Sequence, residues 1–303
     1  MPGQTVSIAV TGATGLVGST LTTALFADSH RVVRVMRAKD KLGADDAHWD
    51  PEAGEIDSAK LKGIDAAVNL AGENLAAGRW SEAKKASIRD SRVKGTELLA
   101  RTLAGLEPKP KVLVSASAVG FYGDSFDAVD ERSPAGAGFL ADVCGSWEEA
   151  CMPASKAGIR VVNLRIGVVL SPDGGALGRM LPPFRMGVGG PVGGGRQWMS
   201  WISIADLVAA IRFALFDGGL SGPVNATAPN PVRNGEFAKT LGRVLRRPAV
   251  TPLPAFAVRM MFGEMGEALL LGGQKVAPAR LEKAGFRFRH PELEPALRHL
   301  LGR

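Results

Sequence analysis

Three glycines near the start of the chain have the spacing of a turn that binds a diphosphate. Gly12, Gly15 and Gly18 stand in "AVTGATGLVGSTL", directly after an apolar strand-like run and at the opening of a helical pattern. Glycine in such a turn lets the backbone approach a pyrophosphate, whose charge is favoured by the N-terminus of the following helix. The third glycine lets that helix pack closely on the strand. The pattern therefore predicts a dinucleotide site, with a sugar-nucleotide site or an empty site as the alternative.

The end of the second predicted strand indicates which dinucleotide binds. A carboxylate at this place would bind the ribose 2′-hydroxyl of NAD. The sequence has "VVRVMRAKDK" instead, with Met36 and Arg37 at the strand end. A guanidinium can bind a 2′-phosphate with two parallel hydrogen bonds, whereas a carboxylate would repel it. We therefore expect NADP(H), the alternative being that Arg37 is simply solvated.

A third stretch, "NLAGEN" at 69–74, follows another strand-like run. Its small residues would let the backbone approach the adenine-side ribose and phosphates, so Leu70, Ala71 and Gly72 are candidate contacts. The alternative is a tight turn that serves packing alone.

The elements that must position these residues alternate along the first 170 residues. β-branched runs predict strands, and apolar residues at three- and four-residue spacing predict amphipathic helices. The predicted strands are 6–10, 31–36, 66–71, 111–117 and 160–170, and the predicted helices are 16–28, 81–104 and 139–157. Such alternation is typical of an α/β fold, a Rossmann-type, doubly wound parallel sheet with helices on both faces.

After residue 170 the composition changes. The segment 171–200 is rich in Gly, Pro and Met, and we expect it to be a loop or lid. A helix at 203–216 and a strand at 222–227 would return to the sheet. We therefore divide the chain into a dinucleotide-binding domain (1–170, with 203–228) and a smaller C-terminal substrate lobe (171–202 and 229–303).

Composition narrows the class of protein. The formal charge is +7, yet no zinc-finger spacing or aromatic-rich basic strand indicates nucleic-acid binding. No apolar run approaches the ~20 residues of a membrane span, and a strand-like pattern begins too early for a signal peptide. Cys144 and Cys151 are predicted to be reduced core thiols. We expect a cytoplasmic protein with a small-molecule substrate and no metal, and the sequence is compatible with a homo-oligomer.

Several longer stretches carry a resemblance to a known family. These are "VTGATGLVG" (10–18), "NLAGENL" (69–75), "SASAVGFYGD" (115–124), "FLADVCGSWE" (139–148), "LRIGVVLS" (164–171), "QWMSWISIAD" (197–206), "GQKVAPARL" (273–281) and "GFRFRHPEL" (285–293). The chain resembles the extended short-chain dehydrogenase/reductase superfamily over nearly its whole length. Within that superfamily it is similar to the atypical epimerase family, sometimes labelled as cell-division-inhibitor-like.

The resemblance implies NADP(H) in a cleft between the main domain and the lobe. Carried over by position, the coenzyme contacts are Gly12, Thr14, Gly15, Leu16, Val17, Met36, Arg37, Leu70, Ala71, Arg92 and Val168. Arg92 lies in a basic helical stretch with Lys84, Lys85 and Arg89. A solvated helix face is therefore the alternative to its role near the phosphates.

The resemblance breaks at the catalytic pair. Typical members of the superfamily exchange a proton through a Tyr whose pKa is lowered by a Lys four residues later. Matching positions on the 139–148 stretch are Phe139 or Leu140 for the Tyr and Val143 or Cys144 for the Lys. The chain has one tyrosine, Tyr122, which lies elsewhere.

Three explanations stay open for this break. Ser117, at the end of its strand, orients the substrate while Tyr122 serves as a displaced acid. Alternatively, another group such as Glu73, Asp206 or Cys144 donates the proton. Otherwise the protein binds NADP(H) without turnover, as a regulatory or interaction protein. Our main prediction is an oxidoreductase or nucleotide-sugar epimerase with Ser117 and Tyr122 as catalytic residues.

The stretch "GGGRQWMSWISIAD" would meet the cleft from the lobe. Its aromatic, amide and guanidinium groups (Arg196, Gln197, Trp198 and Trp201) suit a polar, ring-bearing or phosphorylated ligand. The alternative is that the tryptophans only join lobe and domain.

Overall fold

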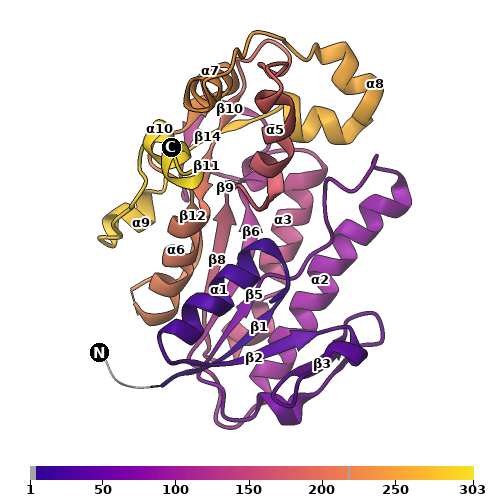
Figure 1. Cartoon of the computed structure of the whole chain (residues 1–303). Helices are drawn as coiled ribbons and strands as arrows, with labels where there is room; N and C mark the ends of the chain where they lie inside the picture. Colours follow the sequence, from indigo (N-terminus) through magenta and orange to yellow (C-terminus); the bar gives the residue numbers. More distant parts are fainter. Residues whose placement is uncertain (1–4, 218) are drawn as a thin grey trace.

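The chain folds around an eight-stranded sheet in the computed structural model, which describes residues 5–217 and 219–303 (Figure 1). The strand order is β12-β8-β6-β5-β1-β2-β3-β4, and every neighbouring pair is parallel except β3 with β4. The chain moves from β1 to β2 on one side and later to β5 on the other, which opens a crevice at the carboxyl end of β1. The strands are β1 (Ser7–Thr11), β2 (Arg31–Met36), β3 (Ala47–Asp50), β4 (Glu55–Ile56), β5 (Ala66–Asn69), β6 (Val112–Ala118), β8 (Arg160–Ile166) and β12 (Gly222–Ala226).

Helices cover both faces of this sheet, as the strand–helix alternation predicts. One layer contains α1 (Leu16–Ala27) and α6 (Ile204–Phe216), and the other contains α2 (Glu82–Ala104), α3 (Phe139–Glu149) and α4 (Met152–Lys156). Successive side chains of a strand point to opposite faces. Thus Ile8 packs in the core with α1, whereas Ala9 packs in the core with α2. The fold class predicted from the sequence is confirmed.

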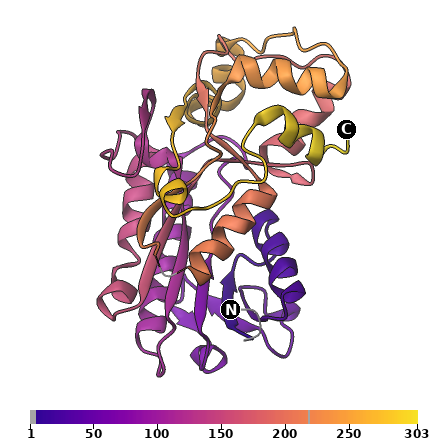
Figure 2. The ribbon, with the colours of Figure 1, turned by 90° about the vertical axis from the view of Figure 1, so that its left-hand side faces the viewer.

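The remaining elements form a lobe beside the carboxyl ends of the strands (Figures 1 and 2). Its core joins α5, α7 and α10 through side chains such as Leu181, Phe237 and Leu297. The lobe helices are α5 (Gly175–Arg185), α7 (Asn234–Leu245), α8 (Ala255–Gly266), the π-helical turn η4 (Glu267–Leu271) and α10 (Leu293–Leu300). The short helix α9 (Ala279–Lys283) instead packs against β12, with Leu281 in the core of the main domain. Three strand pairs complete the lobe: β9 (Val168–Ser171) with β11 (Trp201–Ser203), β10 (Trp198–Met199) with β13 (Val232–Arg233), and β7 (Ser125–Val129) with β14 (Gln274–Val276).

Three predicted elements differ from those observed. The helix expected over 139–157 is two helices, α3 and α4. The strand expected over 160–170 breaks at Gly167, where a Cβ atom would lie 2.5 Å from the carbonyl oxygen of Ser200. The segment expected to be a loop contains α5, which holds Pro182 and Pro183 inside its last turns. At Gly167 a contact made by the folded chain decides where the strand ends, so the local pattern alone misplaces its bounds.

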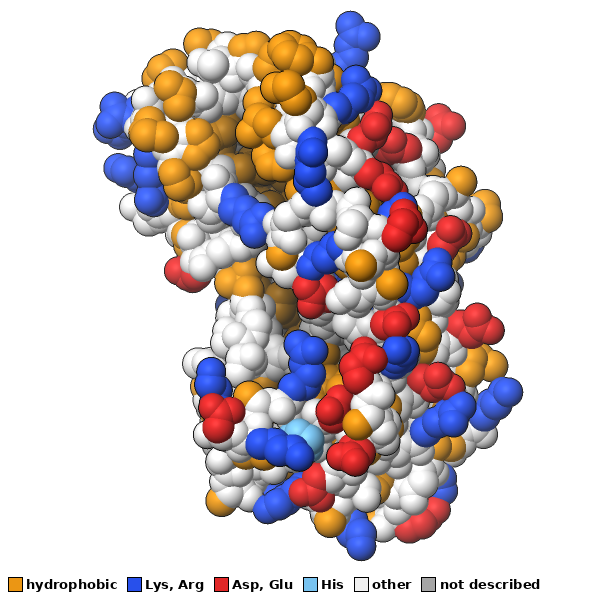
Figure 3. Space-filling model, turned by 90° about the vertical axis from the view of Figure 1, so that its right-hand side faces the viewer, with side chains coloured by type: hydrophobic (Ala, Val, Ile, Leu, Met, Phe, Trp, Pro, Cys, Tyr) orange, Lys and Arg blue, Asp and Glu red, His pale blue; other side chains and the backbone are white. Residues whose placement is uncertain are grey.

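Exposed hydrophobic side chains gather on the lobe. Figure 3 shows them at the top of the molecule, with charged side chains spread over the part below. The most exposed ones in the lobe are Phe126, Met186, Val188, Val250, Phe256, Met260 and Met261. Within residues 5–217 and 219–303, no helix has both the length and the apolar character needed to cross a membrane.

Candidate functional site

The glycine turn after β1 has a shape that only glycine fits. Gly12 has φ +65°, and a Cβ atom there would lie 2.7 Å from the carbonyl carbon of Leu70. A Cβ atom at Gly18 would lie 2.1 Å from the carbonyl oxygen of Gly12, so α1 packs directly on the turn. Gly15 caps α1 without any side-chain hydrogen bond. The first N–H groups of the helix are therefore available to a diphosphate, and this cradle fits a dinucleotide.

A threonine holds the neighbouring turn in place. Thr11 donates from Oγ1 to Oδ1 of Asn69 at 2.7 Å and accepts from the backbone N–H groups of Leu70 and Ala71 at 3.1 and 3.2 Å. This side chain thereby fixes the backbone after β5 against the glycine turn. Neither Thr11 nor Asn69 can be recognised from the sequence, because their role depends on the parallel pairing of β1 with β5.

Arg37 lies at the carboxyl end of β2, beside the same crevice. Its side chain is exposed, and it forms no salt bridge within the described part of the chain. Met36, just before it, is buried. Across the crevice, the ion pair with Lys84 lowers the pKa of Glu73, and Arg37 adds to that effect by its charge. Arg37 is therefore a charged group at the edge of the predicted coenzyme site, available to an anion.

Arg92 is buried rather than solvated. Its guanidinium donates to the carbonyl oxygens of Ile88 and Glu73 at 3.0 Å each and lies 5.1 Å from the ring centroid of Trp147. It also touches the turn after β5, because a Cβ atom at Gly72 would lie 3.2 Å from its Cζ. Burial lowers the pKa of Arg92. The side chain thus lies at the boundary between the predicted coenzyme turn and the cavity described next.

A cavity of about 320 Å³ lies between the carboxyl edge of the sheet and the lobe. The main domain contributes residues of η3 (Val119–Tyr122), α3 and the β8–β9 junction, Val168 included. The lobe contributes α5, the 197–200 segment, η4 and the 272–274 segment. The side chains that line it from the main domain are Leu75, Arg92, Ala118, Val119, Leu140, Val143, Cys144, Trp147, Ile166 and Val168.

The positions of the missing Tyr–Lys pair face this cavity. Leu140 and Cys144, four residues apart on α3, both line it. Phe139 instead lies in an adjoining pocket, with its ring centroid 5.2 Å from that of Trp80. Burial raises the pKa of the Cys144 thiol to about 11. At neutral pH this wall therefore presents an apolar side chain and an uncharged thiol where the superfamily places an acid and a cation.

Ser117 lies behind the cavity wall in a buried ionic cluster. Its hydroxyl donates to Oε1 of Glu148 at 2.7 Å, and the guanidinium of Arg165 binds both oxygens of that carboxylate at 2.8 Å. Strand register produces the cluster, since Ser117 and Asn225 are both direct neighbours of Arg165 across β6, β8 and β12. Glu148 was not anticipated from the sequence, and only its place on α3 reveals its role.

Tyr122 is joined to the same cluster. Its hydroxyl donates to Oδ1 of Asn225 at 2.7 Å and accepts from Arg165 at 3.0 Å, and the residue is 4% exposed. Burial raises the pKa of Tyr122, although the hydrogen bond from Arg165 acts in the opposite direction. Arg165 thus brings Ser117 and Tyr122 into one network, but neither of these two residues is part of the cavity lining.

The other candidate proton donors have structural partners. Asp206 lies in the first turn of α6, and its carboxylate accepts hydrogen bonds from the backbone N–H groups of Arg289 and His290 at 2.7 and 3.0 Å. Glu73 is paired with Lys84. Of the three alternatives, Cys144 is the one that lines the cavity. In the described ranges, no three His, Cys, Asp or Glu side chains are grouped as metal ligands.

The lobe residues predicted to meet the cleft divide into two sets. Gln197 and Trp198 line the cavity. Trp201 is fully buried in the lobe core, and its Nε1 donates to the carbonyl oxygen of Asn230 at 3.0 Å. Arg196 is exposed and outside the lining. Trp198 therefore faces the cavity, whereas Trp201 joins elements of the lobe.

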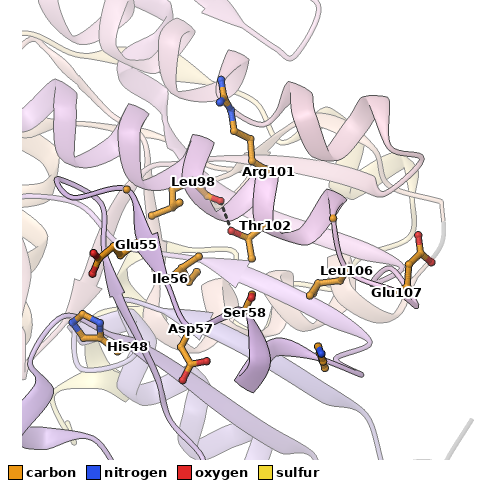
Figure 4. A pocket seen from close by; sticks show the side chains of 13 residues that line it. His48, Glu55, Ile56, Asp57, Ser58, Leu98, Arg101, Thr102, Leu106 and Glu107 are labelled. Atoms are coloured by element: carbon orange, nitrogen blue, oxygen red, sulfur yellow. Dashed lines mark hydrogen bonds between the residues drawn. The ribbon is translucent and has the colours of Figure 1, made fainter.

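A second, larger hollow of about 740 Å³ lies at the sheet edge near β4. Figure 4 shows it between the β3–β4 hairpin and the last turns of α2, with His48, Asp57, Leu98 and Thr102 around it. None of the predicted coenzyme or catalytic residues lines this hollow. We therefore place the functional site in the cavity below the lobe.

Comparison with known proteins shows which family the chain resembles. Residues 8–225 match the NAD dependent epimerase/dehydratase family, and residues 253–300 match a domain of unknown function, DUF1731. An epimerase family protein of Mycobacterium bovis is 49% identical, with 96% of each chain covered. The human epimerase family protein SDR39U1 is 40% identical over 97% of this chain and 99% of its own.

Solved structures extend the likeness. The crystal structure of human SDR39U1 (isoform 2) with NADPH has a TM-score of 0.91 and 38% identity, covering 98% of this chain and all of that one. A nucleoside-diphosphate sugar epimerase from Corynebacterium glutamicum has a TM-score of 0.82 and 37% identity, covering 99% of this chain and 59% of that one. The resemblance read from the sequence is thereby confirmed, and the chain belongs to the NAD dependent epimerase/dehydratase family, among its epimerase family proteins.

Proposed function

We propose that this protein is an NADP(H)-dependent oxidoreductase or epimerase, with the coenzyme in the crevice between the glycine turn and Arg37. The observation that carries the choice of NADP(H) is the free guanidinium of Arg37 at the carboxyl end of β2. A 2′-phosphate there would meet a charge-assisted partner, and the strand end itself carries no carboxylate to repel it. The human relative, whose crystal structure contains NADPH, supports this choice.

The coenzyme, when bound, supplies a hydride donor or acceptor. The chain's own residues bind and orient it. The turn at Gly12–Val17 and the N-terminus of α1 would hold the diphosphate, with Thr14, Gly15 and Leu16 among its contacts. Leu70 and Ala71 offer a fixed backbone beside that turn. Arg92 would contact the sugar-phosphate region, and Val168 would face the reacting end from the cavity wall.

Proton transfer is the open part of the mechanism. The catalytic role of Ser117 and Tyr122 stays a prediction. Both hydroxyls already form hydrogen bonds within the protein, which supports the alternative that Ser117 and Tyr122 hold Glu148 and Arg165 in position. Ser117→Ala and Tyr122→Phe variants distinguish the two roles. Loss of NADPH oxidation with unchanged NADPH affinity would indicate proton transfer, whereas equal losses of activity and thermal stability would indicate positioning.

The coenzyme preference is tested by calorimetry with NADPH and NADH. We expect the wild-type protein to bind NADPH more tightly, and Arg37→Ala to lose about 10- to 100-fold in NADPH affinity, the range of a hydrogen bond to a charged group. NADH affinity should hardly change. Arg287→Ala is the matched control, because it removes an exposed arginine that forms no salt bridge among the described residues.

Equal or tighter binding of NADH by the wild-type protein would overturn the assignment. Binding of NADPH without reduction of any carbonyl substrate, and hence without NADPH oxidation, would favour the second candidate, a regulatory NADP(H)-binding protein. The observation behind that candidate is the pairing of Leu140 with Cys144 on the cavity wall. The cytoplasmic location and the homo-oligomer stay predictions.

A further inference from the structure

The cavity wall formed by the lobe is mostly apolar. Met180 of α5, Met199 of β10, and Leu269 and Leu270 of η4 face it from the lobe, opposite Leu140 and the other apolar side chains of the main domain. Apolar surface of this kind stabilises a ligand roughly in proportion to the apolar area that both partners remove from water. A substrate that binds here must therefore bury hydrocarbon against most of the lining.

Charge is nearly absent from the lining. Arg92 is the one charged side chain among the described residues that line the cavity. Its guanidinium already donates to two backbone carbonyl oxygens, and it lies beside the coenzyme turn at Gly72. A second anionic group in the substrate would therefore have to leave water without a free cation to pair with, which is strongly unfavourable.

Several polar side chains of the lobe wall already form hydrogen bonds within the protein. Nε2 of Gln197 donates to the carbonyl oxygens of Val192 and Leu270 at 3.1 and 2.7 Å. Ser200 donates to the carbonyl oxygen of Gln274 at 2.8 Å. Oδ1 of Asn234 accepts from the N–H of Val192 at 2.8 Å. In the described ranges this leaves Oε1 of Gln197, Nδ2 of Asn234 and the side-chain amide of Gln274, which also lines the cavity, without a hydrogen-bond partner, so the free polar atoms are neutral amide groups.

The cationic side chains near the cavity contact other parts of the protein. Arg233 and Lys275 lie over the ring of Trp198. The ring centroid is 3.8 Å from Cζ of Arg233 and 4.8 Å from Nζ of Lys275, and neither residue lines the cavity. Arg233 also donates to the carbonyl oxygen of Arg196. These side chains fix the indole that forms part of the wall, and they add no charge to the cavity lining.

We propose that the substrate is an uncharged, mainly apolar small molecule with a polar group such as a carbonyl, and not a nucleotide sugar. The inference rests on the proposed function and names its substrate class. A cavity of about 320 Å³ is near the lower end of ligand sites, and a diphosphate with two sugars would not find its counter-charges in it. The amide of Asn234 is available to hold the substrate's polar group.

Calorimetry on the full chain, with and without NADP⁺, tests this substrate class. The probes are menadione, which is an uncharged naphthoquinone, and UDP-glucose. We expect menadione to bind at least about tenfold more tightly than UDP-glucose. Met180→Lys, which puts a charge in the apolar wall, should reduce menadione affinity at least about tenfold. Met186→Lys is the matched control, because Met186 is 70% exposed just beyond α5, and it should change nothing.

Each other outcome overturns the proposal. UDP-glucose binding as tightly as menadione, binding of neither probe, or menadione binding that survives Met180→Lys would each do so. NADP⁺ affinity, measured in the same experiments, separates this proposal from the proposed function. If NADP⁺ binds while menadione does not, only the substrate class is wrong; if NADP⁺ does not bind, the coenzyme assignment is wrong as well.

Discussion

The ionic cluster behind the cavity wall permits a quantitative prediction about stability. Glu148 and Arg165 form a salt bridge in which the side chains are 13% and 4% exposed, and Ser117 donates to the same carboxylate. Glu148→Ala leaves the guanidinium of Arg165 buried without a counter-charge. Breaking a buried pair in this way costs about 3–5 kcal/mol of unfolding free energy. With an unfolding entropy of about 2.1 cal/mol/K per residue over 303 residues, the expected fall in Tm is about 5–8 °C.

Circular dichroism during heating and in urea measures this effect. The matched control is Glu97→Ala, which breaks the exposed pair with Arg101 and should change the unfolding free energy by less than about 1 kcal/mol. The double variant Glu148→Leu with Arg165→Met removes both charges, and we expect it to be more stable than Glu148→Ala. A change below about 1 kcal/mol for Glu148→Ala, equal to the control, would show that the cluster is solvated and that our reading of its burial is wrong.

Three further predictions follow from burial and backbone geometry. Cys144 and Cys151 have pKa values raised to about 11 by burial, so Ellman's reagent at pH 8 should react slowly with the native protein and at once in denaturant; rapid native reaction would contradict the buried placement. Tyr122, the one tyrosine, should ionise above its usual pKa of about 10 in the folded state. Its contribution to stability is therefore complete below about pH 10 and declines as the pH rises further, which absorbance at 295 nm and thermal unfolding can follow. Gly12→Ala should lower both stability and NADPH affinity more than Gly54→Ala, since both have positive φ but only Gly12 lacks space for a Cβ atom; equal losses would contradict the tight cradle.

Sequence alone was sufficient for the features that depend on local pattern. The glycine turn could be predicted because positive φ and close packing at Gly12 and Gly18 require glycine whatever the rest of the chain does. Strands and helices of the main domain follow from periods of two and 3.6 residues. Arg37 could be placed at a strand end for the same reason, and the absence of a Tyr–Lys pair can be read directly from the residues.

The tertiary structure decided what depends on pairing between distant segments. Register across β6, β8 and β12 brings Ser117, Arg165 and Asn225 side by side, and the hydroxyl of Tyr122 reaches an amide 103 residues away. No local period encodes such register, because it is set by how whole strands and helices pack. The same packing buries Arg92, turns Leu140 and Cys144 toward the cavity, and lines that cavity with apolar side chains from the lobe. Residue types thus determined which coenzyme to expect, whereas only the folded arrangement showed which side chains are left to meet a substrate.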